Sequence, residues 1–315
     1  MNKADLELLR PLWLPQTFVS DDDCRQTLKL WLMDGNYYFN NTPPGVSIYC
    51  QNTMDVQKYF SLDAFKFASH AAQTVYELEK TSAYTKLTSW RLIQVYYAAF
   101  FSAHSTLRYF GRSFTHLEGG HVKFIKARCE TEAGYLPKLP SSYYLIKFSP
   151  EKNELSFKEQ DESHKDLWIS YRALLQEISS NVLNLRASED RRRAISNIFS
   201  DIEDSISNHG KNPSGNWLSM VRNEANYKSL QGVWFPFTKD TPLFQELMTK
   251  VKNWRKVSLD IESPNMAKND LERFFLTAFA VIDIGLSLTS DYITLIKKPD
   301  RRLKSYIHLL RSSAA

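Results

Sequence analysis

The sequence predicts a mainly α-helical protein, a helical bundle with one inserted β-hairpin and an extra N-terminal segment. Several segments repeat apolar residues three and four positions apart, while one segment alternates apolar and polar residues around a turn. The 315 residues are 43% hydrophobic and 24% charged, which is enough apolar material for a large core. Only 10 Gly and 12 Pro occur, and no low-complexity tract is present, so a linker-rich chain is excluded.

The first elements are expected as follows. Within residues 1–60 the sequence predicts a helix near Asp21–Leu32. An aromatic and Asn/Pro-rich loop with a short strand is expected after it. Residues 61–80 predict a helix with Ser61 as its N-cap. The strongest helical pattern runs over residues 90–110 and stops at Gly111, a residue type that favours helix C-termini.

A β-hairpin is predicted between Gly134 and Asp161, because two alternating stretches flank a Pro-Glu-Lys-Asn turn. The segment His209–Gly215, HGKNPSG, predicts a break between helices. Helices are expected at residues 164–185, 190–208, 217–230, 244–259 and 270–295.

Several classes of protein and site are excluded by what the sequence lacks. No apolar run reaches about 18 residues and no signal peptide begins the chain, so a cytoplasmic protein without membrane contact is expected. Cys24, Cys50 and Cys129 are scattered, and we expect them to be reduced. The sequence has no glycine-rich phosphate loop and no nucleophile elbow, and His116 and His121 lack a third ligand, so neither a metal nor another cofactor is predicted.

The net charge of +5 is a mild excess that favours polyanions. Arg191, Arg192 and Arg193 form one basic cluster, and six Lys and Arg residues between positions 297 and 311 form another. Such clusters either lie on a solvated surface or contact nucleic acid. We take Arg112 and the Arg191–Arg193 cluster as candidate binding residues for RNA or a nucleotide.

A polar run, RNEANY, interrupts the apolar pattern of the helix that begins at residue 217. It contains Arg222, Asn223, Asn226 and Tyr227. A guanidinium, two amides and a phenol together suit a phosphate or a ribose. The alternative is a structural network in which Arg222 pairs with a buried acid such as Asp283.

Two pieces of sequence together resemble a known family. VYYAAFFSAHSTLRYFG followed by FTHLEGGHV is similar to the first long helix and the following loop of bacterial HEPN domains, and RNEANY resembles their second signature. The resemblance covers residues 61–295, with an insertion at about 125–195. An N-terminal extension, residues 1–60, and a basic tail, residues 296–315, lie outside it.

The resemblance implies a helical bundle that forms a homodimer. Many HEPN members are metal-independent endoribonucleases of toxin-antitoxin and antiviral defence systems, and others have no known catalysis. Carried over to this chain, Arg222 would clamp the phosphate and Asn223 would orient the substrate. Tyr227 stands where the ribonuclease signature has His, and a phenol with an ordinary pKa of about 10 is a poor base. His116, in the expected loop after the first helix, or His209, in the break, would have to replace it.

Two hypotheses follow. The first is a HEPN-like defence or toxin-type effector that cleaves RNA without a metal, with tRNA as one candidate substrate. The alternative is a non-catalytic HEPN-like module that binds a nucleotide, nucleic acid or a protein partner from a toxin-antitoxin or defence operon.

Overall fold

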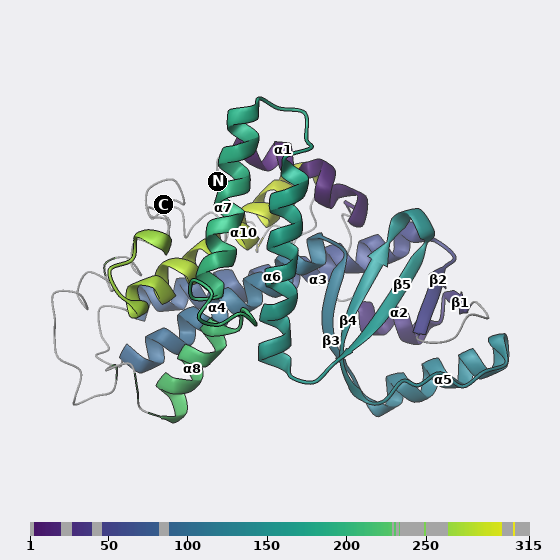
Figure 1. Cartoon of the computed structure of the whole chain (residues 1–315). Helices are drawn as coiled ribbons and strands as arrows, with labels where there is room; N and C mark the ends of the chain where they lie inside the picture. The colour runs from purple at the N-terminus through teal and green to yellow at the C-terminus, as the bar shows by residue number, and fades with distance from the viewer. Residues whose placement is uncertain are drawn as a thin grey trace.

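The computed structural model describes residues 3–19, 27–39, 46–81, 88–228 and 264–297, with Leu230, Val233, Thr249 and Ser305. The described chain is mainly helical and carries a five-stranded antiparallel sheet, which confirms the predicted fold class at that level (Figure 1). Outside the described residues lie the helix expected at residues 244–259 apart from Thr249, almost all of the basic cluster between 297 and 311, and the start of the helix expected near Asp21.

The elements have the following bounds. The helices are α1 (Lys3–Trp13), α2 (Leu28–Asp34), α3 (Thr53–Thr81), α4 (Thr88–Tyr109), α5 (Gly119–Ala133), α6 (Ser163–Val182), α7 (Glu189–Ile206), α8 (Trp217–Tyr227) and α10 (Asp270–Leu295). The strands are β1 (Tyr37–Phe39), β2 (Val46–Cys50), β3 (Arg112–Leu117), β4 (Ser142–Ser149) and β5 (Glu154–Gln160).

Helix α4 lies at the centre of the helical part, packed between α3 and α10 and also contacting α6 and α8. It ends as predicted, because Gly111 adopts φ +66° and its N–H donates to Arg108 O at 3.0 Å. This left-handed backbone conformation favours glycine at position 111. The glycine stop therefore fixes where the chain leaves α4 and enters β3.

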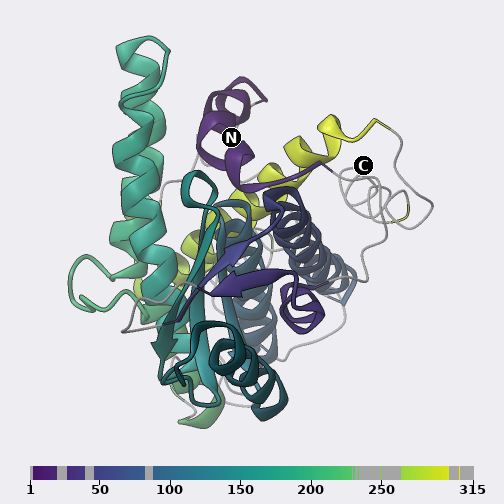
Figure 2. The same ribbon diagram turned by 90° about the vertical axis from the view of Figure 1, so that its right-hand side faces the viewer.

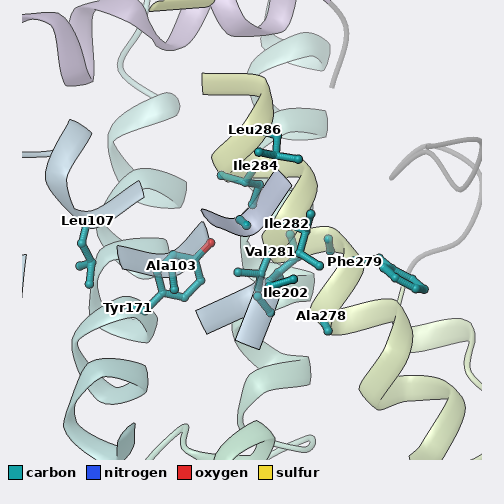
Figure 3. Close-up of a cluster of buried hydrophobic side chains, with 14 of the residues drawn as sticks. Ala103, Leu107, Tyr171, Ile202, Ala278, Phe279, Val281, Ile282, Ile284 and Leu286 are labelled. Carbon is teal, nitrogen blue, oxygen red and sulfur yellow. The ribbon is translucent and has the colours of Figure 1, made fainter. Parts of the chain in front are cut away.

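The main hydrophobic core joins α4, α6, α7 and α10. Figure 3 shows Val281 and Ile282 of α10 close to Ile202 of α7 and Tyr171 of α6, and all four belong to one cluster of buried side chains. The two helices α6 and α7 form an antiparallel pair whose connecting end projects from the molecule (Figure 2). Helix α6 falls inside the segment expected as an insertion, yet its apolar face is part of this core.

Helix α3 begins at Thr53, so the prediction of Ser61 as an N-cap is wrong. Ser61 lies inside the helix, where its hydroxyl donates to Gln57 O at 2.8 Å and accepts the N–H of Phe18 at 3.0 Å. The extra turns of the helix bury Val56 and Phe60 in a second hydrophobic cluster, which lies under the sheet. Helix α3 thus serves both cores.

The predicted hairpin is confirmed as β4 and β5, which are joined by a turn at Pro150–Asn153. It does not stand alone, because it occupies the middle of a sheet with the order β1-β2-β5-β4-β3. The segment after Gly111, expected to be a loop, is strand β3, paired with β4 from Arg112–Lys147 to Leu117–Ser142. Helix α5 then begins at Gly119 and runs beside the sheet (Figure 1).

The N-terminal residues are integrated into the fold. Arg10 of α1 makes a two-pronged ion pair with Asp291 of α10, with Nη2–Oδ1 at 2.6 Å and Nε–Oδ2 at 2.9 Å. Strands β1 and β2 extend the sheet beyond β5. None of the described helices combines the length and apolar character needed to cross a membrane.

Replacement of Gly285 by alanine is expected to destabilise the protein. A Cβ at this position of α10 would lie 2.9 Å from Ser102 Cβ and 3.0 Å from Ser102 O of α4. The overlap with backbone outweighs the usual helical gain from alanine, so Gly285→Ala should lower the free energy of unfolding by about 1–3 kcal/mol. Chemical denaturation measures the change.

The matched control is Gly120→Ala. Gly120 is also helical, and an added Cβ would meet nothing within 4 Å. This variant should be neutral or slightly more stable. Equal destabilisation of both variants would contradict the close-approach explanation.

Candidate functional site

Arg222 lies on α8, which packs against α4 and α6. Only 8% of the residue is exposed. Its Nη1 donates to Asn223 Oδ1 at 2.6 Å, and its Nη2 donates to Tyr97 Oη, also at 2.6 Å. These two contacts hold the guanidinium over the face of α4 that carries the tyrosines.

Aromatic rings surround the Arg222 guanidinium. Its Cζ lies 5.5 Å from the ring centre of Tyr96, 5.4 Å from that of Tyr97 and 5.9 Å from that of Tyr227, which is within the range of cation–π attraction. Among the described residues its hydrogen-bond partners are neutral, and the expected pair with Asp283 is not formed. The buried Nε also lacks a partner there. The charge therefore stands without a carboxylate beside it.

The histidine beside Arg222 is His164, the second residue of α6, which the sequence interpretation missed. Its Nε2 lies 3.4 Å from Arg222 Nη2, a long contact, and its Nδ1 lies 2.9 Å from Tyr96 Oη. No local signal distinguishes His164 from a polar residue that opens a helix. Tertiary packing of α6 against α4 brings it to Arg222.

The hydrogen-bond network assigns the proton positions on His164. Arg222 and Trp168 have only donors, so Arg222 donates toward His164 Nε2, and Trp168 Nε1 donates to Tyr96 Oη at 3.1 Å. His164 Nδ1–H then donates to the same phenol oxygen. In this arrangement the Nε2 lone pair of His164 faces Arg222.

The surroundings keep His164 neutral. Burial, and then the charge of Arg222, lower the pKa of His164 from 6.5 to about 4. Burial likewise raises the pKa of Tyr96 to about 12, so it remains a phenol at neutral pH. Both members of the pair are thus uncharged, and the site carries the charge of Arg222.

A cavity of about 340 Å³ opens beside this cluster, between the helical part and the sheet. Tyr97 and His164 line it, so two partners of Arg222 form part of its wall. Four further aromatic side chains line it, namely Phe67, Phe100, Phe114 and Tyr143.

The interior of the cavity holds a second basic group, Arg108, whose charge is balanced. Arg108 Nε donates to Asp63 Oδ2 at 2.9 Å, and Arg108 Nη1 lies 3.1 Å from His104 Nδ1. Burial, and then the charge of Arg108, hold the pKa of His104 well below 6.5. His104 is therefore neutral, and because its Nδ1 accepts from Arg108, its proton is on Nε2.

The predicted site residues are only partly brought together. His116 lies on β3 and lines the cavity, with its ring 4.8 Å from that of Tyr143. Asn223 contacts Arg222 directly, Asn226 is half-buried on α8, and Tyr227 is 73% exposed with its ring over Arg222.

His209 does not approach Arg222 as expected. It lies in the loop before α8, and its Nδ1 forms a hydrogen bond with Asp204. The backbone explains the difference, because Asn208, His209 and Gly210 all adopt positive φ and turn the chain sharply at the end of α7.

The predicted basic residues form contacts within the chain. Arg112 pairs with Glu177, and Arg191 donates to Asp5 of α1 at 3.1 Å. Arg192 Nη1 donates to Leu183 O at 2.6 Å, and Arg193 pairs with Glu189. The three arginines open α7, at the end of the α6–α7 pair opposite His164, roughly 30 Å away along α6. They do not form part of this site.

No family model, curated protein or solved structure matches this chain. Within the described residues no group of three or more His, Cys, Asp or Glu side chains is arranged to hold a metal ion. The residues of the site thus have to be interpreted from their own chemistry.

We expect protein stability to fall as the pH is lowered from 6.5 to 4. In this interval an unfolded His164 gains a proton and the folded one does not, since its folded pKa is about 4. Below about pH 4 both states are protonated and this contribution levels off. Denaturation at several pH values measures the slope, which should be smaller for His164→Gln than for the wild type.

The same experiment has two controls. In His209→Gln, which removes a histidine outside the site, the pKa of His164 followed by NMR should stay near 4. Arg222→Gln removes the neighbouring charge, so the pKa of His164 followed by NMR should move up toward 6.5. A His164 that titrates at its ordinary pKa in the wild type would contradict the assigned geometry.

Proposed function

We propose that this chain is a HEPN-like effector that cleaves RNA without a metal, with Arg222 and His164 as the central residues. The observation that supports the proposal is the 3.4 Å contact between Arg222 Nη2 and His164 Nε2 at the edge of a cavity. It pairs a cation for the phosphate with a neutral imidazole, two of the three groups that such cleavage needs. His164 then takes the role for which Tyr227 is chemically unsuited.

The proposed reaction uses three side chains. His164 Nε2 takes the proton of the ribose 2′-hydroxyl, and the 2′-oxygen forms a bond with phosphorus. The bond from phosphorus to the 5′-oxygen breaks, and that oxygen takes a proton from the Tyr97 hydroxyl. Arg222 neutralises the charge that develops on the phosphate. The products are a 2′,3′-cyclic phosphate and a 5′-hydroxyl, and proton exchange with water restores both side chains.

The low pKa of His164 is compatible with this role. A histidine with a pKa of about 4 is neutral at pH 7, so its Nε2 can accept a proton once Arg222 Nη2, 3.4 Å away, turns to the phosphate, but its basicity is weak. A phosphate bound at Arg222 offsets the positive charge that helps lower this pKa. Substrate binding is therefore expected to make His164 a stronger base.

The setting follows the resemblance. We infer a cytoplasmic protein that acts as a homodimer in a toxin-antitoxin or defence system, with tRNA as one candidate substrate. The partner and the substrate are inferred from this resemblance and not from the contacts of Arg222 and His164.

A second candidate function is a non-catalytic module that binds a nucleotide, nucleic acid or a protein partner. The observation that favours it is the burial of Arg222, which is 8% exposed and already engaged with Tyr97 and Asn223. A group so well held is suited to fixing a ligand, even where no bond is broken.

RNA cleavage is expected to depend on both central residues. Total cellular RNA and purified tRNA are incubated with the full chain, with a chelator present throughout. His164→Gln and Arg222→Ala should each slow cleavage at least about 100-fold, because each removes a group that acts in the transition state. The 2′,3′-cyclic phosphate end is detected directly on the products.

His209→Gln is the matched control, since His209 lies outside the site, and it should cleave at the wild-type rate. Circular dichroism establishes that each variant is folded. Cleavage that survives in His164→Gln, or that stops with the chelator, contradicts the mechanism. A wild-type protein that binds RNA and leaves it intact supports the binding module.

A further inference from the structure

The cavity beside Arg222 is not lined by Arg222 itself, although Tyr97 and His164 line it. Its walls come from α3, α4, β3, β4 and the start of α6, so it lies between the helical part and the sheet. Its volume of about 340 Å³ is at the small end of the range for ligand pockets in proteins. It suits one compact group rather than a long segment of a ligand.

The wall of this cavity is aromatic. Phe100 lies 4.6 Å from the ring of His164 and 4.7 Å from that of His104, and Phe114 stacks on Tyr143 with 6.0 Å between ring centres. Flat aromatic walls favour a flat aromatic occupant, because base stacking on such side chains is favourable for every nucleobase.

The charges favour an uncharged group inside and an anion at the edge. Inside, the charge of Arg108 is balanced by Asp63 at 2.9 Å. At the edge, no carboxylate is in ion-pair range of Arg222 among the described residues. A nucleotide has this distribution, with a neutral base and an anionic phosphate.

His104, which lines the cavity, carries a hydrogen-bond donor. His104 Nδ1 is occupied by Arg108 Nη1 at 3.1 Å, so Nε2 carries the proton. In the part of the chain that the structure describes, no partner is found for this N–H. The ring nitrogens and carbonyl oxygens of nucleobases are acceptors that fit such a donor.

We propose that this cavity binds the nucleobase of the nucleotide whose phosphate lies at Arg222. The inference rests on the proposed function for the phosphate, and it adds the group that is recognised. In RNA the base would be unstacked from its neighbours and inserted between the aromatic side chains, as single-stranded RNA permits.

The test compares ligands with and without a base. Calorimetry on the full chain measures the affinity for 3′-AMP, 3′-GMP, 3′-CMP, 3′-UMP and ribose 5-phosphate. At least one of the nucleotides should bind at least about tenfold more tightly than ribose 5-phosphate, as expected for one stacked base. Phe100→Leu should remove most of this difference, and Arg222→Gln should weaken all five ligands.

Phe101→Leu is the matched control. Phe101 is the next residue of α4 and is equally half-buried, but it does not line the cavity, and its ring packs on Phe67, His70, Tyr97 and Phe100. It should bind the ligands like the wild type. Should Phe100→Leu fail to fold, Thr115→Phe is a second variant. Thr115 is half-buried on β3 and lines the cavity, so the ring of a phenylalanine there would occupy part of its volume. This variant should lower the affinity for the nucleotides and leave the affinity for ribose 5-phosphate unchanged.

The outcomes separate the inference from the proposed function. The base site is overturned, even if RNA is cleaved, by either of two results. One is that the nucleotides bind no better than ribose 5-phosphate, and the other is that Phe100→Leu and Phe101→Leu change the affinities equally. Base-dependent binding without cleavage of RNA supports the base site and contradicts the proposed nuclease activity. A competition experiment distinguishes RNA from a free nucleotide. A short oligoribonucleotide that displaces 3′-AMP indicates a site for RNA, and one that leaves 3′-AMP bound indicates a site for the free nucleotide.

Discussion

The packing of α4 between α3 and α10 is the constraint on which the rest of the structure depends. The two helices α4 and α10 approach so closely at Gly285 that an added Cβ would overlap the backbone of Ser102. Tyr97, His104 and Arg108 project from this same helix, and α6 and α8 pack on it. The position of α4 in the core therefore sets the distances at the candidate site, and a side chain carried by a mobile loop would not be held as closely.

Two buried arginines of this region are treated differently by the fold. Arg108 has Asp63 beside it, and such pairing offsets the cost of removing a guanidinium from water. Arg222 is about as buried, but the described residues offer it amide and phenol oxygens, an imidazole nitrogen and aromatic faces. Burying a charge with neutral partners is costly unless an anion completes the site. This contrast is the physical reason for treating Arg108 as structural and Arg222 as a ligand-binding group.

The sequence predicts the elements whose signals are local. The spacing over residues 90–110 with its glycine stop, the hairpin around Pro150, and α10 were all found, because each pattern is contained in one short segment. Strand β3 was missed, since its pairing partner lies about thirty residues away, and the start of α3 was missed because Val56 and Phe60 are buried by the sheet. The importance of Arg222 was suggested by its polar neighbours. His164 was not found, since only the tertiary contact of α6 with α4 brings it close.

In the proposed reaction the base comes from outside the signature. In the ribonuclease signature the base follows the arginine by four to six residues on the same helix, but an imidazole supplied by another helix can also reach an arginine. His164 does so from α6, with its Nδ1 held by Tyr96 and its Nε2 toward Arg222. In the proposed reaction His164 is a weak base before the substrate binds, because burial and the charge of Arg222 lower its pKa. A bound phosphate reduces the effect of that same charge, so the base strengthens only when its substrate is present. Because His164 takes the proton of the ribose 2′-hydroxyl in this reaction, position 227 does not have to supply a base and can be a tyrosine.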